Sequence, residues 1–178
     1  MARDGIVAID KPAGVTSHDV VAMMRKAFQT RRVGHGGTLD PMATGVLVIG
    51  VGQATRALQF VADASKRYSA TVRFGVATNT DDAEGEILHS ISAAHLTVDQ
   101  VKQAFAQLVG EVEQVPPAFS AIKVEGVRSY KRAREGEDFD LPARKVSVHD
   151  IRIVDTQQNG EYLDVDIDVL CGKGVYIR

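Results

Sequence analysis

The clearest structural signal in the chain is the stretch NGEYLDVDIDVLC, residues 159–171. Apolar side chains stand at every second position from Leu163 to Val169, and aspartates stand between them. This period of two indicates a strand with one buried side and one solvent-facing side. Asn159-Gly160 is a hairpin turn signal, and residues 144–154 before it have the pattern of another strand. This part of the sequence therefore predicts a β-hairpin.

Strand and helix signals alternate irregularly through the rest of the sequence. Further strands are expected at 5–10, 46–49, 67–74 and 86–91. Helices are expected after Ser17, which we assign as an N-cap, across residues 54–61, and after Thr97, which forms a capping box with Gln100. Because regular strand–helix–strand units are missing, we expect an α+β fold with a mixed, largely antiparallel sheet flanked by helices.

Composition narrows the class of protein. Of the 178 residues, 44% are hydrophobic and 25% are charged, a balance that supports a buried core and excludes a disordered chain. No apolar run approaches the ~20 residues of a membrane span, and the N-terminus lacks a signal-peptide pattern. The single Cys171 excludes an internal disulfide and favours a reducing environment. We therefore expect a cytoplasmic protein without membrane association.

Any affinity for nucleic acid must be local, because 21 Lys and Arg face 23 Asp and Glu, for a net charge of -2. Basic residues are concentrated around Tyr130, and a basic patch with an aromatic suits phosphate contacts and base stacking. These basic residues are Lys123, Arg128, Lys131, Arg132 and Arg134. The alternative is a solvated mixed-charge helix, since acidic residues follow between Glu135 and Asp140.

The loop GHGGTLDPMATG, residues 34–45, is the strongest candidate for a functional site. Its four glycines allow a ligand to approach the backbone closely. Asp40 precedes Pro41, which disfavours helical geometry at the aspartate. Such loops commonly carry function when a rigid scaffold displays them, although an ordinary turn capped by Asp40 remains the alternative.

Two weaker patterns point to other functions. Gly50-Val51-Gly52 resembles the start of a dinucleotide fingerprint, but the third glycine is missing. Asp164, Asp166 and Asp168 resemble the start of a calcium loop, although their spacing indicates the solvent face of a strand. The five histidines and the single cysteine have no metal-ligand spacing, so we expect neither a metal nor a cofactor.

Several segments together resemble the TruB family of bacterial tRNA pseudouridine synthases. They are DKPAGVTSHDVV (10–21), GHGGTLDPMATGVL (34–47), KRY (66–68), VPPAFSAIKVEGVRSYKRAREG (115–136) and CGKGVYIR (171–178). The resemblance covers essentially the whole chain. It implies an isomerase that flips the T-loop uridine at tRNA position 55 out of the RNA stack and converts it to pseudouridine.

The resemblance also implies roles for individual residues. Asp40 matches the catalytic carboxylate, Tyr68 a residue against the flipped base, and Arg178 the arginine that pairs with the carboxylate. His35 would fill the gap that the base leaves in the RNA. The remaining implied substrate-binding positions are Tyr176, Lys11, Pro12, Gly37 and Thr38. The basic residues around Tyr130 would contact RNA backbone from an insertion at about 114–145.

Expectations about the whole protein follow from the same resemblance. Family members continue past the last motif with more of the catalytic domain and usually a small RNA-binding domain of the PUA type. We therefore expect residues 1–178 to be a catalytic domain truncated at Arg178, without the PUA-type domain. The implied partner is the T stem-loop of tRNA, with no obligate protein partner and a monomer when full length. Two alternatives stay open: an RNA-binding fragment without turnover, and a guide-RNA-dependent pseudouridine synthase.

Overall fold

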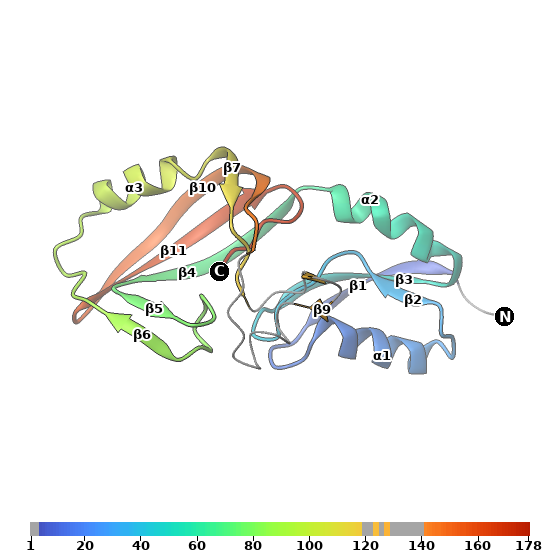
Figure 1. The fold of residues 1–178 in the computed structure, drawn as a ribbon. Coiled ribbons are helices and arrows are strands. Elements are labelled where there is room, and N and C mark those ends of the chain that lie inside the picture. The colour runs from blue at the N-terminus through green and yellow to red at the C-terminus, as the bar shows by residue number, and fades with distance from the viewer. Residues whose placement is uncertain (1–3, 119–122, 125–126, 129–140) are drawn as a thin grey trace. The chain divides into compact units, whose positions relative to one another are not determined.

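The computed structural model describes residues 4–118, 123–124, 127–128 and 141–178, and it divides the chain into two compact units, Met1–Ala64 and Ser65–Arg178 (Figure 1). Each unit has its own sheet and its own buried apolar cluster. The expected insertion at about 114–145 lies largely outside the described residues. Within it, β8 (Lys123–Val124) and β9 (Val127–Arg128) pair as a short antiparallel ladder.

The first unit is a small antiparallel sheet with a helix on each face. Its strands are β1 (Gly5–Lys11), β2 (Val33–His35) and β3 (Gly45–Val51), in the order β1-β3-β2. The helical elements are α1 (Ser17–Ala27), the 3-10 helix η1 (Gly52–Ala57) and α2 (Leu58–Asp63). Figure 1 shows α1 and α2 on opposite faces of the sheet.

The two faces of this sheet are packed differently. On the α1 side, apolar side chains form a buried cluster of Val20, Val21, Val33, Leu47, Ile49 and Val51. On the α2 side, glycines replace side chains: a Cβ on Gly36 would lie 2.8 Å from Cγ1 of Val61, and one on Gly34 would lie 3.2 Å from Cδ1 of Leu58. The glycines therefore allow the short helix α2 to lie directly on the sheet.

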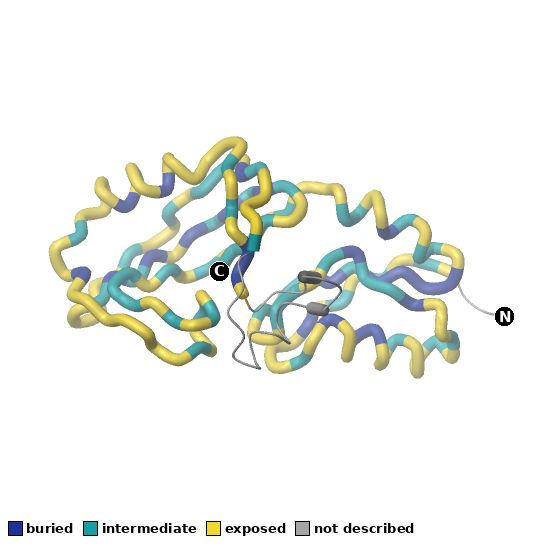
Figure 2. The backbone as a smooth tube through the Cα atoms, in the orientation of Figure 1, coloured by how far each residue is buried: buried dark blue, intermediate teal, exposed yellow. Residues whose placement is uncertain are grey.

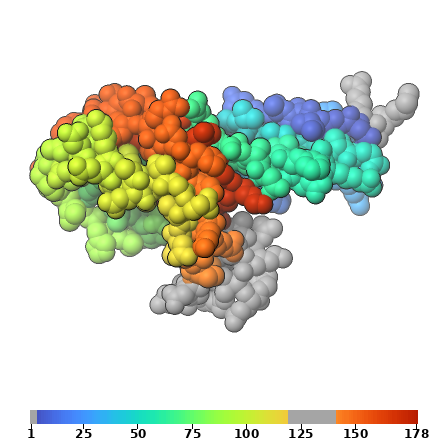
Figure 3. Space-filling view, turned by 90° about the horizontal axis from the view of Figure 1, so that it is seen from above, coloured from blue at the N-terminus to red at the C-terminus, as the bar shows by residue number. Residues whose placement is uncertain are grey.

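The second unit is built on a four-stranded antiparallel sheet in the order β4-β11-β10-β7. The strands are β4 (Lys66–Phe74), β7 (Gly110–Gln114), β10 (Arg144–Asn159) and β11 (Tyr162–Cys171). The helix α3 (Val98–Ala106) packs on one face, and Figure 3 shows it beside β10 on the surface. A separate hairpin joins β5 (Val76–Thr78) to β6 (Ile87–Ser90).

The alternation along β11 determines which side of this sheet is buried. Leu163, Val165, Ile167, Val169 and Cys171 all lie in the core cluster, and Figure 2 shows buried positions recurring along the strand. The intervening aspartates face partners on β4: Arg73 binds Asp164, Thr71 binds Asp166 and Arg67 binds Asp168. These contacts support the assignment of the aspartates to the polar face of a strand.

The expected α+β fold with largely antiparallel sheets is confirmed. One helix start is wrong by a residue, because Thr16 is the N-cap of α1 and Ser17 is its first residue. The helix expected at 54–61 is divided between η1 and α2, and β10 continues to the hairpin turn instead of ending at 154. Among the described residues, no helix has the length and apolar character to cross a bilayer.

Candidate active site

The Asp40 loop, residues 34–45, is bound by a fully buried lysine at the end of β1. Lys11 has an exposed fraction of 0%, and its Nζ donates to the carbonyl oxygens of Pro12 (2.9 Å), Val15 (2.8 Å) and Pro41 (3.0 Å). An ammonium carries three N–H donors, and these three carbonyls accept them. A buried cation needs such compensation because it has lost its water. Lys11 therefore fastens the loop at Pro41, the residue after Asp40.

Asp40 itself lies half-buried between two anchored neighbours. The carbonyl of Pro41 accepts a second bond from the backbone N–H of Gly14 (2.9 Å), and the backbone of Leu39 is bound by the hydroxyl of Ser17. The carbonyl of Asp40 accepts a bond from the N–H of Ala43 (3.1 Å), which closes a turn. A carboxylate that must act on a substrate needs this kind of fixed support.

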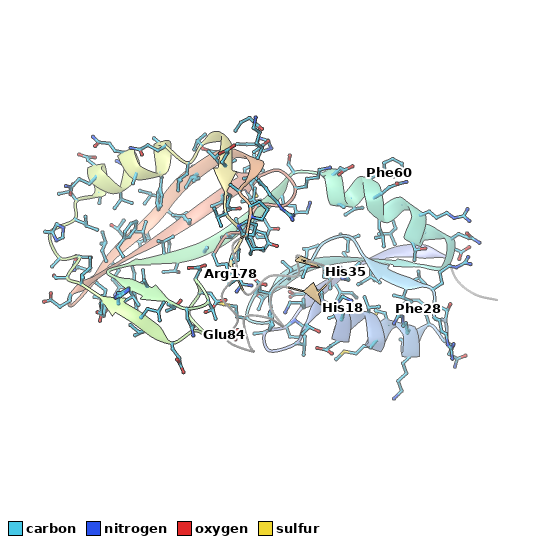
Figure 4. The ribbon with its side chains drawn as sticks, in the orientation of Figure 1. His18, Phe28, His35, Phe60, Glu84 and Arg178 are labelled. Carbon is cyan, nitrogen blue, oxygen red and sulfur yellow. The ribbon has the colours of Figure 1, made fainter. Side chains whose placement is uncertain are left out.

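His35 ends β2 at the other side of the same loop. Its Nδ1 lies 2.7 Å from the carbonyl oxygen of Gly37. A carbonyl only accepts, so Nδ1 is the protonated nitrogen and Nε2 carries the lone pair. The ring of His18 meets it edge-on at 5.4 Å between centroids, and Figure 4 shows the two side chains. Burial lowers the pKa of His35, against the opposing effect of the Gly37 carbonyl, so a neutral ring is favoured at pH 7.

The other substrate-binding residues expected in the first unit lie near these anchors. Pro12 and Thr38 are exposed, and Gly37 is partly exposed. Pro12 directly follows Lys11 and contributes a carbonyl to its ammonium, while Gly37 contributes the carbonyl that fixes His35. Lys11, Pro12, His35, Gly37, Thr38 and Asp40 are therefore gathered around one loop of the first unit.

Two expected tyrosines belong to the second unit. Tyr68 lies on β4 opposite Val169 of β11, partly buried against the core cluster. Tyr176 lies beyond β11, and both of its backbone groups bind the side chain of Gln114: its N–H donates to Oε1 (2.9 Å), and its carbonyl accepts from Nε2 (2.8 Å). The Gln114 amide thus fixes the segment that leads to Arg178.

Arg178 forms a nearly buried ion pair within the second unit. Its Nη1 donates to Oδ2 of Asp82 at 2.8 Å and to the carbonyl of Thr80 at 3.2 Å. The side chains of Arg178 and Asp82 are only 12% and 9% exposed. The other carboxylate oxygen of Asp82 accepts bonds from the Thr80 hydroxyl (2.6 Å) and the Glu84 N–H (3.0 Å). The pairing of Arg178 with Asp40 joins different units and stays a prediction.

Asp82 is the residue that the sequence analysis did not identify. It lies in the polar turn between β5 and β6, 96 positions from Arg178 along the chain. Local sequence signals describe the turn but not its distant partner. A usable signal was the cluster Thr78, Thr80 and Asp82, in which both hydroxyls bind to Asp82: that of Thr78 to its carbonyl and that of Thr80 to its carboxylate.

Most of the expected RNA-backbone residues lie outside the described part of the chain. They are Lys131, Arg132 and Arg134. The backbones of Lys123 on β8 and Arg128 on β9 pair with each other in the short antiparallel ladder. Their role stays a prediction.

The dinucleotide-like glycines have a structural explanation. Gly50 lies under α2, where a Cβ would be 3.0 Å from Cγ of Leu58, and Gly52 has a positive φ of 62°. The N–H of Gln53, where a phosphate would be expected to bind, donates to the Asp4 carboxylate at 2.8 Å. Among the residues that the structure describes, no group of three or more His, Cys, Asp or Glu is placed to hold a metal ion.

Sequence comparison identifies close relatives of the chain. The family model described as "TruB family pseudouridylate synthase (N terminal domain)" matches residues 25–177. The tRNA pseudouridine synthase B of Mycobacterium avium is 53% identical over 178 residues, which are 100% of this chain and 58% of that protein. That of Streptomyces avermitilis is 54% identical over 98% of this chain and 60% of that protein. The chain thus spans about three fifths of the length of these relatives.

Solved structures show the same fold. A crystal structure of a Cbf5-Nop10-Gar1 complex matches 98% of this chain and 41% of its own, with a TM-score of 0.68 and 30% identity. A structure of an H/ACA RNP bound to a substrate RNA containing 2'-deoxyuridine matches 98% of this chain and 39% of its own, with a TM-score of 0.63 and 27% identity.

Proposed function

This chain belongs to the TruB family of pseudouridylate synthases, and on that basis we propose that it is the catalytic part of a tRNA pseudouridine synthase. Its substrate is the T-loop uridine at tRNA position 55, and it acts in the cytoplasm without a guide RNA. The observation that carries the proposal is the Asp40 loop, which matches the family and whose backbone is anchored on both sides of the carboxylate.

The reaction is an isomerisation, so every atom of the substrate is retained. The N1–C1′ bond of the uridine breaks, the uracil turns, and a C5–C1′ bond forms. The C5 hydrogen leaves as a proton, and N1 gains a proton. The step balances without an oxidant, a reductant or a transferred phosphoryl group. A carboxylate suits chemistry at a glycosidic carbon, and we assign this role to Asp40.

The uracil must leave the RNA stack before the carboxylate can act. We assign Tyr68 and Tyr176 to the pocket of the flipped base, with Tyr68 placed to assist removal of the C5 proton. His35, held in one orientation by the Gly37 carbonyl, fills the gap in the RNA. We assign to Arg178 the role of orienting the Asp40 carboxylate, since a guanidinium has five N–H donors and can serve a second carboxylate beside Asp82.

The RNA itself is bound through its backbone by the basic residues around Tyr130. They are Lys123, Arg128, Lys131, Arg132 and Arg134. Phosphate contacts make affinity fall with salt, and each lost contact reduces the slope of log K against log salt by roughly 0.7–0.9. The working form is a monomer that needs no protein partner.

Asp40→Asn tests the proposed function directly. The substitution keeps the size of the side chain and removes its charge, so RNA binding should persist while turnover disappears. Turnover is measured as tritium released from a T stem-loop RNA labelled at uridine C5, without guide RNA. Asp99→Asn is the matched control, because Asp99 is 87% exposed on α3.

Three results would contradict this proposal. Tritium release by the Asp40→Asn protein at the wild-type rate would remove Asp40 from the chemistry. RNA binding by the wild-type protein without any release would indicate a binding protein. Release that requires an added guide RNA would place the protein in the guide-dependent class.

A further inference from the structure

Ser17 is a buried polar residue whose hydroxyl does not cap α1, although the sequence predicts it as the N-cap. Ser17 is 1% exposed, and among the described residues only Lys11 is also both polar and buried. The N-cap of α1 is Thr16: its hydroxyl accepts the N–H of Asp19 (3.1 Å), and the Asp19 carboxylate accepts the N–H of Thr16 (2.8 Å). This capping box leaves the Ser17 hydroxyl available for a contact outside the helix.

That contact is with a single residue of the Asp40 loop. The Ser17 Oγ accepts the backbone N–H of Leu39 at 3.0 Å and donates to the backbone carbonyl of Leu39 at 3.1 Å. A hydroxyl can act as donor and acceptor at once, so one side chain satisfies both backbone groups of Leu39. The contact joins positions 22 residues apart, in the manner of a strand partner. Leu39 also packs against the buried cluster of the first unit.

The position of Leu39 determines the position of Asp40. The Leu39 carbonyl belongs to the peptide plane that ends at the Cα atom of Asp40, so the Ser17 bond fixes the orientation of that plane. On the other side, the Pro41 carbonyl is bound by Lys11 and Gly14, and the Pro41 ring restricts the conformations open to Asp40. With both neighbouring residues anchored, the carboxylate keeps little freedom beyond its own side-chain rotations.

We propose that Ser17 is a positioning residue for the Asp40 carboxylate. The inference rests on the proposed function of Asp40. A purely structural serine would lower stability when removed and leave the rate of the folded protein unchanged. A positioning serine affects the chemical step, because a displacement of ~1 Å in a reacting group can reduce a rate on the order of 100-fold. RNA affinity should change little in that case.

The test compares Ser17→Ala with Thr55→Val in the full-length protein. Thr55 is a matched control, since its hydroxyl donates to the Gly52 carbonyl at 2.8 Å in the same unit, outside the Asp40 loop. Four quantities are measured: the melting temperature, the RNA dissociation constant, the single-turnover rate of tritium release, and the hydrogen-exchange protection of the Leu39 amide. Ser17→Cys replaces the oxygen with a larger sulfur that is a weaker donor and acceptor, and it replaces the alanine variant if that variant does not fold.

We expect Ser17→Ala to reduce the single-turnover rate by ~10- to 100-fold while the RNA dissociation constant stays within about threefold. Leu39 protection should fall, and Ser17→Cys should give an intermediate rate. Thr55→Val should melt at a similarly reduced temperature but retain the wild-type rate. Equal rates for Ser17→Ala and Thr55→Val would refute the positioning role.

Different results would refute the proposed function and the positioning role of Ser17. A wild-type protein that releases no tritium refutes the proposed function and, with it, any role in positioning a catalytic group. An active wild-type protein whose Ser17→Ala variant keeps both its rate and its Leu39 protection refutes only the role of Ser17.

Discussion

Two regions of the molecule hold a charged side chain by different means: the Asp40 loop (residues 34–45) fixes the backbone around Asp40, and the Asp82 turn (residues 79–86, between β5 and β6) binds Arg178. In the loop, buried donors from Lys11 and Ser17 end on backbone carbonyls next to Asp40. In the turn, Asp82 holds Arg178 through a carboxylate–guanidinium bond of 2.8 Å. A backbone carbonyl keeps its acceptor role at every pH, whereas a carboxylate loses charge when it is protonated. The anchors that Lys11 and Ser17 make to these carbonyls should therefore persist at acidic pH, whereas the turn should depend on the charge of the Asp82 carboxylate.

The largest effect is expected from removing Lys11, the buried donor at the end of β1 that anchors the loop. Lys11→Met keeps the length of the side chain but leaves the Pro12 and Val15 carbonyls without their ammonium, while Pro41 retains the Gly14 N–H. Each unsatisfied buried acceptor costs ~1–3 kcal/mol, so the free energy of unfolding should fall by about 3 kcal/mol. Urea denaturation measures this loss.

Lys26→Met is the control for that substitution. Lys26 is exposed in the last turn of α1, and surface substitutions usually change stability by less than ~0.5 kcal/mol. An equal loss of stability in both variants would show that the buried bonds of Lys11 do not hold the loop.

The second effect is expected in the turn, where two adjacent aspartates give a matched pair. Asp82→Asn removes the charge that faces Arg178, and hydrogen bonds to charged groups are worth ~1.5–3 kcal/mol, so we expect a loss of about 2 kcal/mol. Asp81 is exposed with a positive φ of 58°, which asparagine also tolerates, so Asp81→Asn should stay within ~0.5 kcal/mol of wild type. Thermal unfolding distinguishes the two, and equal melting temperatures would contradict the role of the ion pair.

Local signals predicted most of the helices and strands. The alternation from Leu163 to Val169 gave the central strand, and the capping box of Thr97 and Gln100 gave the start of α3. The start of α1 was misassigned, although Thr16 has Asp19 three positions later, where Ser17 has only Val20. A capping box needs a polar side chain at that third position, so the correct cap was readable.

The contacts that hold the site could not be predicted in the same way. Ser17 and Leu39 are 22 residues apart, Lys11 and Pro41 are 30 apart, and Asp82 and Arg178 are 96 apart. Local propensity describes each segment alone, whereas such partners are brought together by the tertiary fold. The glycine-rich loop therefore indicated Asp40, the family resemblance supplied its role and the candidate Arg178, and the anchoring contacts came from the structure.

A smaller effect is expected at His18, which lies beside the loop without bonding to its backbone in the contacts described. The rings of His18 and His35 meet edge to face at 5.4 Å between centroids. His18→Ala should raise the pKa of His35 toward its ordinary value, because it exposes the ring and removes the electrostatic effect of His18. NMR titration of the His35 ring protons measures the change, and His89→Ala, at an exposed position of the second unit, is the control.

The sign of the pH dependence follows from the lowered pKa of His35. The unfolded chain binds this proton more readily than the folded chain, so stability from His35 is fully present above the ordinary histidine pKa of ~6.5 and declines as pH falls below it. His18→Ala should reduce this decline. A His35 ring that titrates identically in the wild-type and His18→Ala proteins would show that His18 does not influence it.

The smallest effect is expected at the ion pair of Arg73 and Asp164, whose cation is half exposed. Comparing it with the pair of Arg178 and Asp82 tests how much burial adds to charge. Arg73 binds Asp164 through two bonds of 2.7 and 2.6 Å, and together with Asn159 it lowers the pKa of Asp164 to about 2. The difference in burial lies in the cations: the Arg73 side chain is 50% exposed against 12% for Arg178, while the carboxylates of Asp164 and Asp82 are 13% and 9% exposed. Solvent screening limits exposed pairs to ~0–1 kcal/mol, so Arg73→Gln should cost less at pH 7 than Asp82→Asn.

The stability that this pair contributes also falls as the pH falls, as it does for His35. The causes differ, because Arg73 stabilises the charged form of Asp164, whereas burial disfavours the charged form of His35. A lowered carboxyl pKa gives stability that is present above the unfolded value of ~3.9 and is lost as pH falls toward 2. Arg73→Gln should raise the pKa of Asp164 and flatten this acid-side loss, while the Asn159 bond of 3.0 Å keeps part of the shift. Carbon-detected NMR titration of the Asp164 carboxyl and urea denaturation at pH 7 and pH 3 measure both quantities. Equal costs for Arg73→Gln and Asp82→Asn at pH 7 would mean that charge alone, and not burial, gives the Asp82 turn its strength.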